Sequence, residues 1–224
     1  MTIEGQIAEA GGLTMPSIRA ADIDVHDVPL IKATAESFAD YGRLERSFED
    51  ATVDIVTWPQ PGWRPIDDGT GTGGGIAQGA FEFWWSGAIY RARNLAVDGD
   101  YVIGWFGDPA TASTETRDVN RSHIFVCEAN YHPDSSQTFF PRNRDEFVAL
   151  LALPGEDVTP EDFVAFYCDG SFGITIKPGV WHQPVFPLRN NAIFDNKQGR
   201  VHACISCAFV AEFRCYLSVP LRTA

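Results

Sequence analysis

Short apolar runs separated by polar breaks dominate the chain from residue 80 onward. Alternating or continuous apolar stretches of four to eight residues predict strands, and Gly and Pro breaks separate one strand from the next. About ten short strands at this spacing indicate an all-β domain, either a sandwich or a barrel. The strands predicted in this way cover residues 52–58, 81–85, 89–96, 101–106, 124–128, 137–140, 147–153, 171–176, 180–187 and 201–209.

The rest of the pattern adds two short helices and an arm. Thr34 can cap a short helix that ends at Gly42 and carries Phe38 on its apolar face, and Thr159 precedes a second brief helix. Residues 1–28 show no sustained period and few large apolar side chains. They predict an extended N-terminal arm, a candidate to wrap a partner subunit, ahead of a single domain over residues 29–224.

Composition narrows the classes of partner. The formal net charge is −13, which argues against nucleic acid and anionic membranes because both require a basic surface. The sequence contains no apolar run of membrane-spanning length, and its first residues lack the features of a secretory signal. Five cysteines, an odd number in mostly apolar runs, indicate buried, reduced thiols. We therefore expect a cytoplasmic protein without nucleic-acid or membrane partners.

Two motifs suggest ligand sites that their context does not support. The glycines of residues 69–75 resemble a phosphate-binding loop, but no Gly-Lys-Ser/Thr follows them, so we expect no nucleotide cofactor. A mobile loop is the main interpretation of this segment, and a lid over a site is the alternative. Cys204 and Cys207 have the spacing of a metal knuckle, but residues three apart on a strand point to opposite faces.

The most informative motif extends from Gly173 to His182. It predicts a strand, a tight turn at Pro178-Gly179 and a second strand that presents the imidazole of His182. This pattern, Gly-x(4)-Pro-Gly-x-x-His, resembles the second motif of the cupin barrels. Its Gly-Val-Trp-His-x-Pro core looks like the ureidoglycolate lyase family of cupins.

A second polar segment supports the same resemblance. Residues 128–141 are similar to the family pattern Glu-x-His-Pro-x-x-Ser-Gln-x-Phe-x-Pro, with two extra residues between Glu128 and His132. Residues 31–42 and 87–96 resemble two further family segments, so the likeness covers roughly residues 30–190. It implies an antiparallel, RmlC-like cupin β-barrel that forms a homodimer. It also implies cleavage of ureidoglycolate to glyoxylate and urea in allantoin degradation, a part of purine catabolism.

The sequence departs from the family at several polar positions. Arg93 and Asn94 stand where the family tends to have histidine and aspartate, and residues 129–131 replace an arginine between the glutamate and the histidine. Near the C-terminus, residues 205–208 replace an Asp-Arg pair. We therefore expect this chain to share the barrel fold of the family more closely than its substrate.

The residues themselves suggest roles in cleaving a carbon–nitrogen bond beside a hydroxyl group. Such a lyase needs a base for the hydroxyl proton and an acid for the leaving nitrogen, and His182, His132 and Glu128 are the candidates. A small carboxylate substrate needs a cation, and arginine pairs with carboxylates in a bidentate manner. The assigned substrate-binding residues are Arg91, Arg93, Gln137 for the ureido group, and Trp181, for which a place in the barrel wall is the alternative.

Three questions stay open at this point. A divalent metal held by His132, His182 and Glu128 is one possibility, although the His-x-His pair of regular cupin metal sites is missing. The enzyme could instead be a cupin of another class, an isomerase or a metal-dependent oxygenase, and bound iron with oxygen uptake would identify the latter. It could also be a non-catalytic cupin that binds a small ligand without turnover. His123, His202 and His26 are interpreted as structural or exposed.

Overall fold

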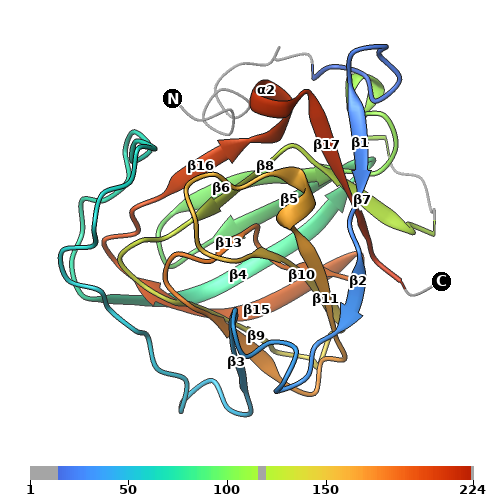
Figure 1. Ribbon diagram of the computed structural model, residues 1–224. Helices are drawn as coiled ribbons and strands as arrows, with labels where there is room; N and C mark the ends of the chain where they lie inside the picture. The colour runs from blue at the N-terminus through green and yellow to red at the C-terminus, as the bar shows by residue number, and fades with distance from the viewer. Residues whose placement is uncertain (1–14, 116–119, 223–224) are drawn as a thin grey trace.

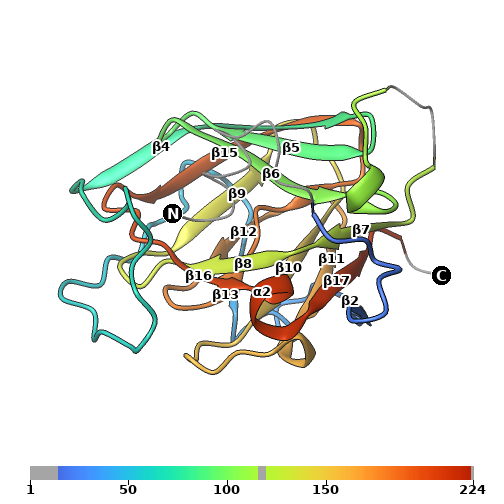
Figure 2. The ribbon, with the colours of Figure 1, turned by 90° about the horizontal axis from the view of Figure 1, so that it is seen from above.

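The computed structural model describes residues 15–115 and 120–222, and these form a mostly β protein (Figure 1). Within this part of the chain the strands form two sheets, one of ten strands and one of seven. The sheets face one another as two layers, with β4, β5 and β15 in one and β8, β10 and β16 in the other (Figure 2). The all-β prediction is confirmed.

The larger sheet has the order β1-β17-β7-β6-β5-β4-β15-β9-β12-β3. Its strands are β1 (Asp24–Asp27), β3 (Gly42–Glu45), β4 (Ile76–Ser86), β5 (Ile89–Asn94), β6 (Gly99–Trp105), β7 (His123–Val126), β9 (Gln137–Pro141), β12 (Gly173–Ile176), β15 (Asn191–Gly199) and β17 (Cys215–Pro220).

The smaller sheet has the order β16-β8-β13-β10-β11-β2, with β14 paired to β10. Its strands are β2 (Leu30–Lys32), β8 (Glu128–Tyr131), β10 (Phe147–Ala152), β11 (Val164–Cys168), β13 (Trp181–His182), β14 (Phe186–Pro187) and β16 (Ile205–Ala208). The short helical elements are η1 (Pro109–Thr111), η2 (Pro160–Asp162) and α2 (Phe209–Phe213).

The chain crosses repeatedly from one sheet to the other. β7 and β8 are separated by Cys127 alone and belong to different sheets, and β9–β10, β12–β13 and β16–β17 cross in the same way. Each crossing places consecutive segments on opposite walls of the space between the sheets. The walls therefore combine residues that are far apart in the sequence.

The main core lies where the apolar faces of the strands pack together. β10 is buried along its whole length, which confirms the prediction of a buried strand from its continuous apolar run. Phe81 and Phe83 of β4 contact Phe139 and Phe194 through ring centroid distances of 5.4 and 5.5 Å, respectively. All five cysteines are buried thiols outside any disulfide, as expected from their apolar surroundings.

Several predicted elements differ from the structure. The segment after Thr34 forms successive turns and not a helix: Phe38 N makes one helical bond to the Thr34 carbonyl, but Ala39 N and Tyr41 N bond three residues back, to the carbonyls of Glu36 and Phe38. The strand predicted over residues 52–58 is reduced to one isolated bridge between Ile55 and Ser135. The second brief helix is the 3-10 turn η2.

The N-terminal arm is described only in part, because residues 1–14 lie outside the described residues. From residue 15 onward the segment packs against its own chain: Met15 and Ile23 are buried, and β1 pairs in parallel with β17. Among the described helices, none has both the length and the apolar character needed to cross a membrane.

Candidate functional site

A cavity of about 430 Å³ lies between the sheets, and four of the buried polar side chains, Asn94, His132, Gln137 and His182, line it. Strands β5, β8, β9 and β13 and the connection between β15 and β16 each supply part of its wall. The polar lining residues include Asn94, Asn130, His132, Gln137, His182, His202 and Cys204, together with residues 67–70 of the glycine-rich segment.

Two histidines meet because β8 and β13 are antiparallel neighbours. His182 pairs in register with Asn130, and His132 follows directly after β8, so both imidazoles enter the cavity with ring centroids 5.1 Å apart. His182 Nδ1 lies 2.8 Å from the carbonyl oxygen of Val180, and His132 Nδ1 lies 3.1 Å from that of Ala203. An Nδ1–H can donate to each carbonyl, which leaves both Nε2 atoms turned into the cavity.

Gln137 lies between the two imidazoles. Its Oε1 is 3.2 Å from His132 Nε2 and 3.2 Å from His182 Nε2. An oxygen lone pair cannot bond to a nitrogen lone pair, so each contact requires an Nε2–H, a rotated amide that donates, or a cation between the atoms. This part of the cavity can therefore exchange protons or hold a positive charge.

A network of buried amides fixes the position of Gln137. Its Nε2 donates to Asn196 Oδ1 and to Gln198 Oε1, both at 3.0 Å. Asn94 Nδ2 also donates to Gln198 Oε1, at 2.8 Å. A buried amide without a hydrogen-bond partner lowers the stability of the fold. The network therefore holds each of its amides in one orientation.

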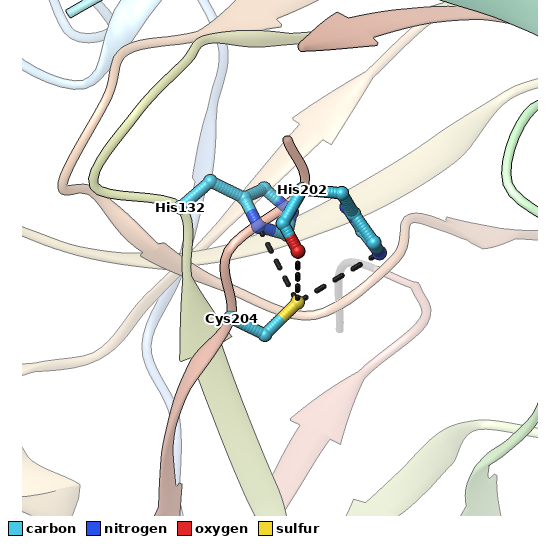
Figure 3. Close-up of side chains that lie close together, drawn as sticks. All are labelled: His132, His202 and Cys204. Atoms are coloured by element: carbon cyan, nitrogen blue, oxygen red, sulfur yellow. Dashed lines mark hydrogen bonds between the residues drawn. The ribbon is translucent and has the colours of Figure 1, made fainter. Parts of the chain in front are cut away.

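His202 and Cys204 complete the polar wall. His202 lies 2.5 Å from Gln198 through its Nδ1 and adopts a φ of +48°, a left-handed conformation that non-glycine residues seldom occupy. Cys204 Sγ lies 3.5 Å from His132 Nδ1 and 3.7 Å from His202 Nε2. Figure 3 shows the sulfur between the two rings. Among the described residues, His132, His202 and Cys204 are a group able to hold a metal ion.

Burial determines the protonation state of the three imidazoles. Loss of water, with a smaller contribution from repulsion between His132 and these rings, lowers the pKa of His182 and of His202 to about 3. Burial also lowers the pKa of His132, against the opposing effect of the Ala203 carbonyl and the Asp134 carboxylate. All three rings are therefore neutral near pH 7 and present lone pairs.

The cavity is acidic. Four aspartates, Asp67, Asp68, Asp98 and Asp100, are among its lining residues, of which Asp100 is ion-paired with Arg93, and none of the described lining residues is a lysine or an arginine. A negative wall disfavours a free anion and favours a cation. This feature opposes the expectation of an arginine-lined pocket.

The structure brings together three of the predicted site residues, His132, His182 and Gln137. Glu128 does not line the cavity: it begins β8, four residues before His132, which is about 13 Å along an extended strand. Trp181 is also absent from the lining. It is fully buried in the core, where its Nε1 donates to the carbonyl of Gly155 at 2.7 Å.

The arginines of β5 lie on the other side of their strand. Side chains alternate along β5, so that Tyr90, Ala92 and Asn94 are buried, whereas Arg91 is half-buried and Arg93 is exposed. Arg93 forms an ion pair with Asp100 at 2.7 Å. Asn94, which replaces a family aspartate, is the residue of this strand that reaches the cavity.

Two residues of the cavity wall and two of the amide network that holds Gln137 were missed from the sequence. His202 was interpreted as structural or exposed, and its partner Cys204 was considered only together with Cys207; the structure places both in the cavity wall. Asn196 and Gln198 belong to β15, which was not predicted. The signal was present, because Ala192, Phe194, Asn196 and Gln198 follow the period of two that marks one strand face, but the last two are polar.

The glycine-rich segment contributes to the cavity. Asp67 N donates to the Cys204 carbonyl at 2.8 Å, Gly71 N donates to the Val201 carbonyl at 3.0 Å, and Cys204 N donates to Thr70 Oγ1 at 3.1 Å. These bonds join the segment to the residues that carry His202 and Cys204.

Comparisons with known proteins agree with the resemblance noted in the sequence. Residues 110–214 match the model of the ureidoglycolate lyase family, which confirms the resemblance over this part of the chain. A ureidoglycolate lyase of Azotobacter vinelandii is 36% identical over 63 residues, which are 28% of this chain and 38% of that protein. One from Salmonella paratyphi B is 35% identical over 63 residues, or 28% and 39% of the two chains. The chain thus spans under two fifths of the relatives that it matches.

Proposed function

We propose, from the premise that residues 110–214 match the ureidoglycolate lyase family, that this protein is a lyase of that type. It would cleave a carbon–nitrogen bond in ureidoglycolate or a related small α-hydroxy carboxylate, releasing glyoxylate and urea. The observation that carries the proposal is the pair of imidazole Nε2 atoms, each 3.2 Å from the Gln137 amide inside one cavity.

The reaction requires two proton transfers. A base removes the hydroxyl proton, the carbon–oxygen bond becomes a carbonyl, and the carbon–nitrogen bond breaks as its electrons go to nitrogen, which takes up a proton. His182 Nε2 would accept the first proton, and the imidazolium so formed would return it to the leaving nitrogen, while His132 Nε2 would accept a hydrogen bond from the substrate. Gln137 would hold the ureido group through amide hydrogen bonds.

The acidic wall makes a positive group necessary for a carboxylate substrate. With no arginine or lysine among the described lining residues, the substrate carboxylate needs a bound cation beside the imidazoles. His132, His202 and Cys204 form a ligand group that fits a divalent ion. When bound, such an ion would polarise an oxygen of the substrate and offset its negative charge.

The same acidic wall favours a second candidate function. A metal-dependent cupin of another reaction class, such as an isomerase or an oxygenase, would use the pocket for a different small acid. A non-catalytic cupin would bind its ligand without turnover. Asn94 and Asn130, at positions where the sequence departs from the family, and the His132–His202–Cys204 group support these alternatives.

We also propose the remaining features of a family enzyme. The repeated crossing of the chain between facing sheets supports a cupin-type barrel, and buried thiols outside any disulfide support a cytoplasmic location. The exposed side chains of Trp58 and Trp63, on one loop, support a homodimer that covers them. Light scattering after size exclusion would give twice the chain mass for wild-type protein and a smaller value for Trp58→Ser/Trp63→Ser.

The decisive experiment is an assay of glyoxylate release from racemic ureidoglycolate, with and without added divalent metal. We expect turnover in wild-type protein, loss of at least about 100-fold in His182→Gln, and little change in His123→Gln, a matched histidine on β7. Absence of release under every metal condition would exclude the lyase reaction. Metal-dependent oxygen uptake would instead support the second candidate.

A further inference from the structure

The side chains of His132, His202 and Cys204 lie close together (Figure 3). His132 comes from the end of β8, and His202 and Cys204 come from the connection between β15 and β16. Cys204 Sγ is 3.5 Å from His132 Nδ1 and 3.7 Å from His202 Nε2. None of the three was predicted to act with the other two.

We propose that His132 Nδ1, His202 Nε2 and Cys204 Sγ form a binding site for a thiophilic divalent cation of the Zn²⁺ class. Tetrahedral zinc has a Zn–S bond of about 2.3 Å and Zn–N bonds of about 2.0–2.1 Å, which place sulfur and nitrogen about 3.6 Å apart. The two observed separations lie on either side of this value. Two imidazoles and one thiolate are also the donors that zinc prefers over magnesium or calcium.

The surroundings leave room for a fourth ligand. His132, His202 and Cys204 all line the cavity of about 430 Å³, so the fourth coordination position opens toward the space where a substrate or water would lie. Three protein ligands with one open position are typical of catalytic rather than structural zinc.

The local charge also requires a cation. Asp134 is buried beside His132, and its Oδ1 accepts a hydrogen bond from Ala203 N at 3.1 Å. Its other oxygen, Oδ2, has no hydrogen-bond partner within the part of the chain that the structure describes. Asp67, whose Oδ2 accepts from Ser206 Oγ at 2.6 Å, adds a second carboxylate near His132. A divalent ion would compensate the buried charge of Asp134 and the partly exposed charge of Asp67.

Metal binding at Nδ1 would determine which ring nitrogen of His132 carries the proton. The Cys204 thiol would release its proton to solvent, and the Nδ1 lone pair would be taken by the metal. The His132 proton would then reside on Nε2, from which it can donate to Gln137 Oε1 at 3.2 Å. Without metal, Nδ1 donates to the Ala203 carbonyl instead. The ion would thus convert His132 into a hydrogen donor toward the interior of the cavity.

This site differs from a metal position between the two Nε2 atoms and Gln137, and it stands independently of the lyase reaction. Co²⁺ distinguishes the two positions, because a thiolate ligand gives an intense near-ultraviolet charge-transfer band that nitrogen and oxygen ligands do not. We would titrate Co²⁺ into wild-type protein, Cys204→Ala, His202→Gln, His182→Gln and the matched control Cys168→Ala, a buried thiol on β11.

We expect the thiolate band in wild-type protein, Cys168→Ala and His182→Gln. It should vanish in Cys204→Ala, and His202→Gln should weaken binding by more than the roughly 10–100-fold that loss of an outer-sphere partner costs. Zn²⁺ should displace Co²⁺ with loss of the band. No band in wild-type protein would overturn the proposal, as would a band that survives in Cys204→Ala or disappears in a folded His182→Gln.

Alkylation of the wild-type protein tests the site without any substitution. Zn²⁺ should slow iodoacetamide labelling of Cys204 at least about tenfold, read by mass spectrometry of its peptide, and leave the other four cysteines unchanged. Equal labelling with and without Zn²⁺ would contradict the proposal. Neither readout uses glyoxylate release, so failure of the site and failure of the lyase function are distinguishable.

Discussion

Gln137 is the residue on which the polar centre depends, because one neutral amide contacts two imidazoles and two further amides. Gln137→Glu would place a carboxylate at the same distance from both Nε2 atoms. An opposite charge within about 4–6 Å favours the protonated ring and raises the pKa of a histidine by roughly 1–3 units. We therefore expect the pKa of His182, about 3 in the native protein, to rise clearly toward its ordinary value.

The measurement is a proton NMR titration of the imidazole Cε1–H signals in chelator-treated protein. Gln137→Met is the control, because it removes the amide and adds no charge. If Gln137→Glu and Gln137→Met titrate alike, the imidazoles do not sense this position.

The low pKa values of the buried histidines also predict the acid stability of the metal-free protein. In the unfolded chain His182 and His202 titrate near 6.5, and in the folded protein near 3. Between pH 3 and pH 6.5 the unfolded state therefore binds more protons than the folded state. The stability that neutral rings contribute is complete above pH 6.5 and is lost progressively as the pH falls toward 3.

We expect the free energy of unfolding to fall by roughly 2 kcal/mol for each of these two imidazoles between pH 6.5 and 5. Urea denaturation at several pH values, with chelator present, measures this slope. His202→Gln should have a shallower slope than wild-type protein, and an unchanged slope would show that the His202 imidazole is not buried in the neutral form.

At the scale of elements, the alternation of β5 separates the roles of neighbouring residues. Asn94 faces the cavity, whereas Arg93 faces solvent. Asn94→Leu would remove one of three amide donors to Gln198 Oε1 and place an apolar side chain in the network, and it should lower kcat/KM roughly tenfold or more. Arg93→Gln should change it less than about twofold. Steady-state kinetics on both variants tests this prediction. A large rise in KM for Arg93→Gln would show that Arg93 binds the substrate carboxylate after all.

The segment that carries Asp67–Thr70 is anchored by a buried arginine. Arg64 donates to both carboxylate oxygens of Glu212, at 2.9 and 2.7 Å, and to the carbonyls of Ser206 and Glu156. It thereby joins the segment to β16 and α2. The guanidinium is buried, so its loss affects both the pair and the carbonyls that it satisfies.

Arg64→Leu should lower the free energy of unfolding by about 2–3 kcal/mol, below the 3–5 typical of a fully buried pair because the Glu212 side chain is 33% exposed. It should also expose residues 59–79 to limited proteolysis. The control is Arg142→Leu, which breaks an exposed pair with Asp195 and should cost under about 1 kcal/mol. Equal effects of the two substitutions would show that Arg64 is not an anchor.

Apolar period and turn chemistry were sufficient to predict many of the strands, but β15 with its polar inner face, several short strands, and the apolar strands β11 and β17 were missed. β10 and the turn before His182 follow directly from their residues. β15 was missed because Asn196 and Gln198 are polar on its buried face, where the usual apolar signal is replaced by hydrogen bonding within a network. His202 was missed because a single histidine outside a strand has no period to reveal its partners.

At the scale of the molecule, the site is assembled by topology. Asn94, Gln137, His182 and Cys204 are separated by more than twenty residues each in the chain, and they meet because successive strands alternate between the facing sheets. The motifs around His132 and His182 fixed two of these positions through the family resemblance. Which side chains of the other strands point into the cavity depends on strand register. A shift of one residue would turn the opposite set of side chains inward.

This long-range assembly makes the stability of the whole fold sensitive to a metal at the His132–His202–Cys204 site. An ion that binds the folded chain and not the unfolded chain stabilises it by about 2.7 kcal/mol at a free concentration of 100 times Kd. For a chain of 224 residues this corresponds to a rise in Tm of roughly 5–10 °C. We expect this rise in calorimetry of wild-type protein and Cys168→Ala with Zn²⁺, and no rise in Cys204→Ala, since its ligand set is incomplete. An equal rise in all three proteins would place the stabilising ion elsewhere.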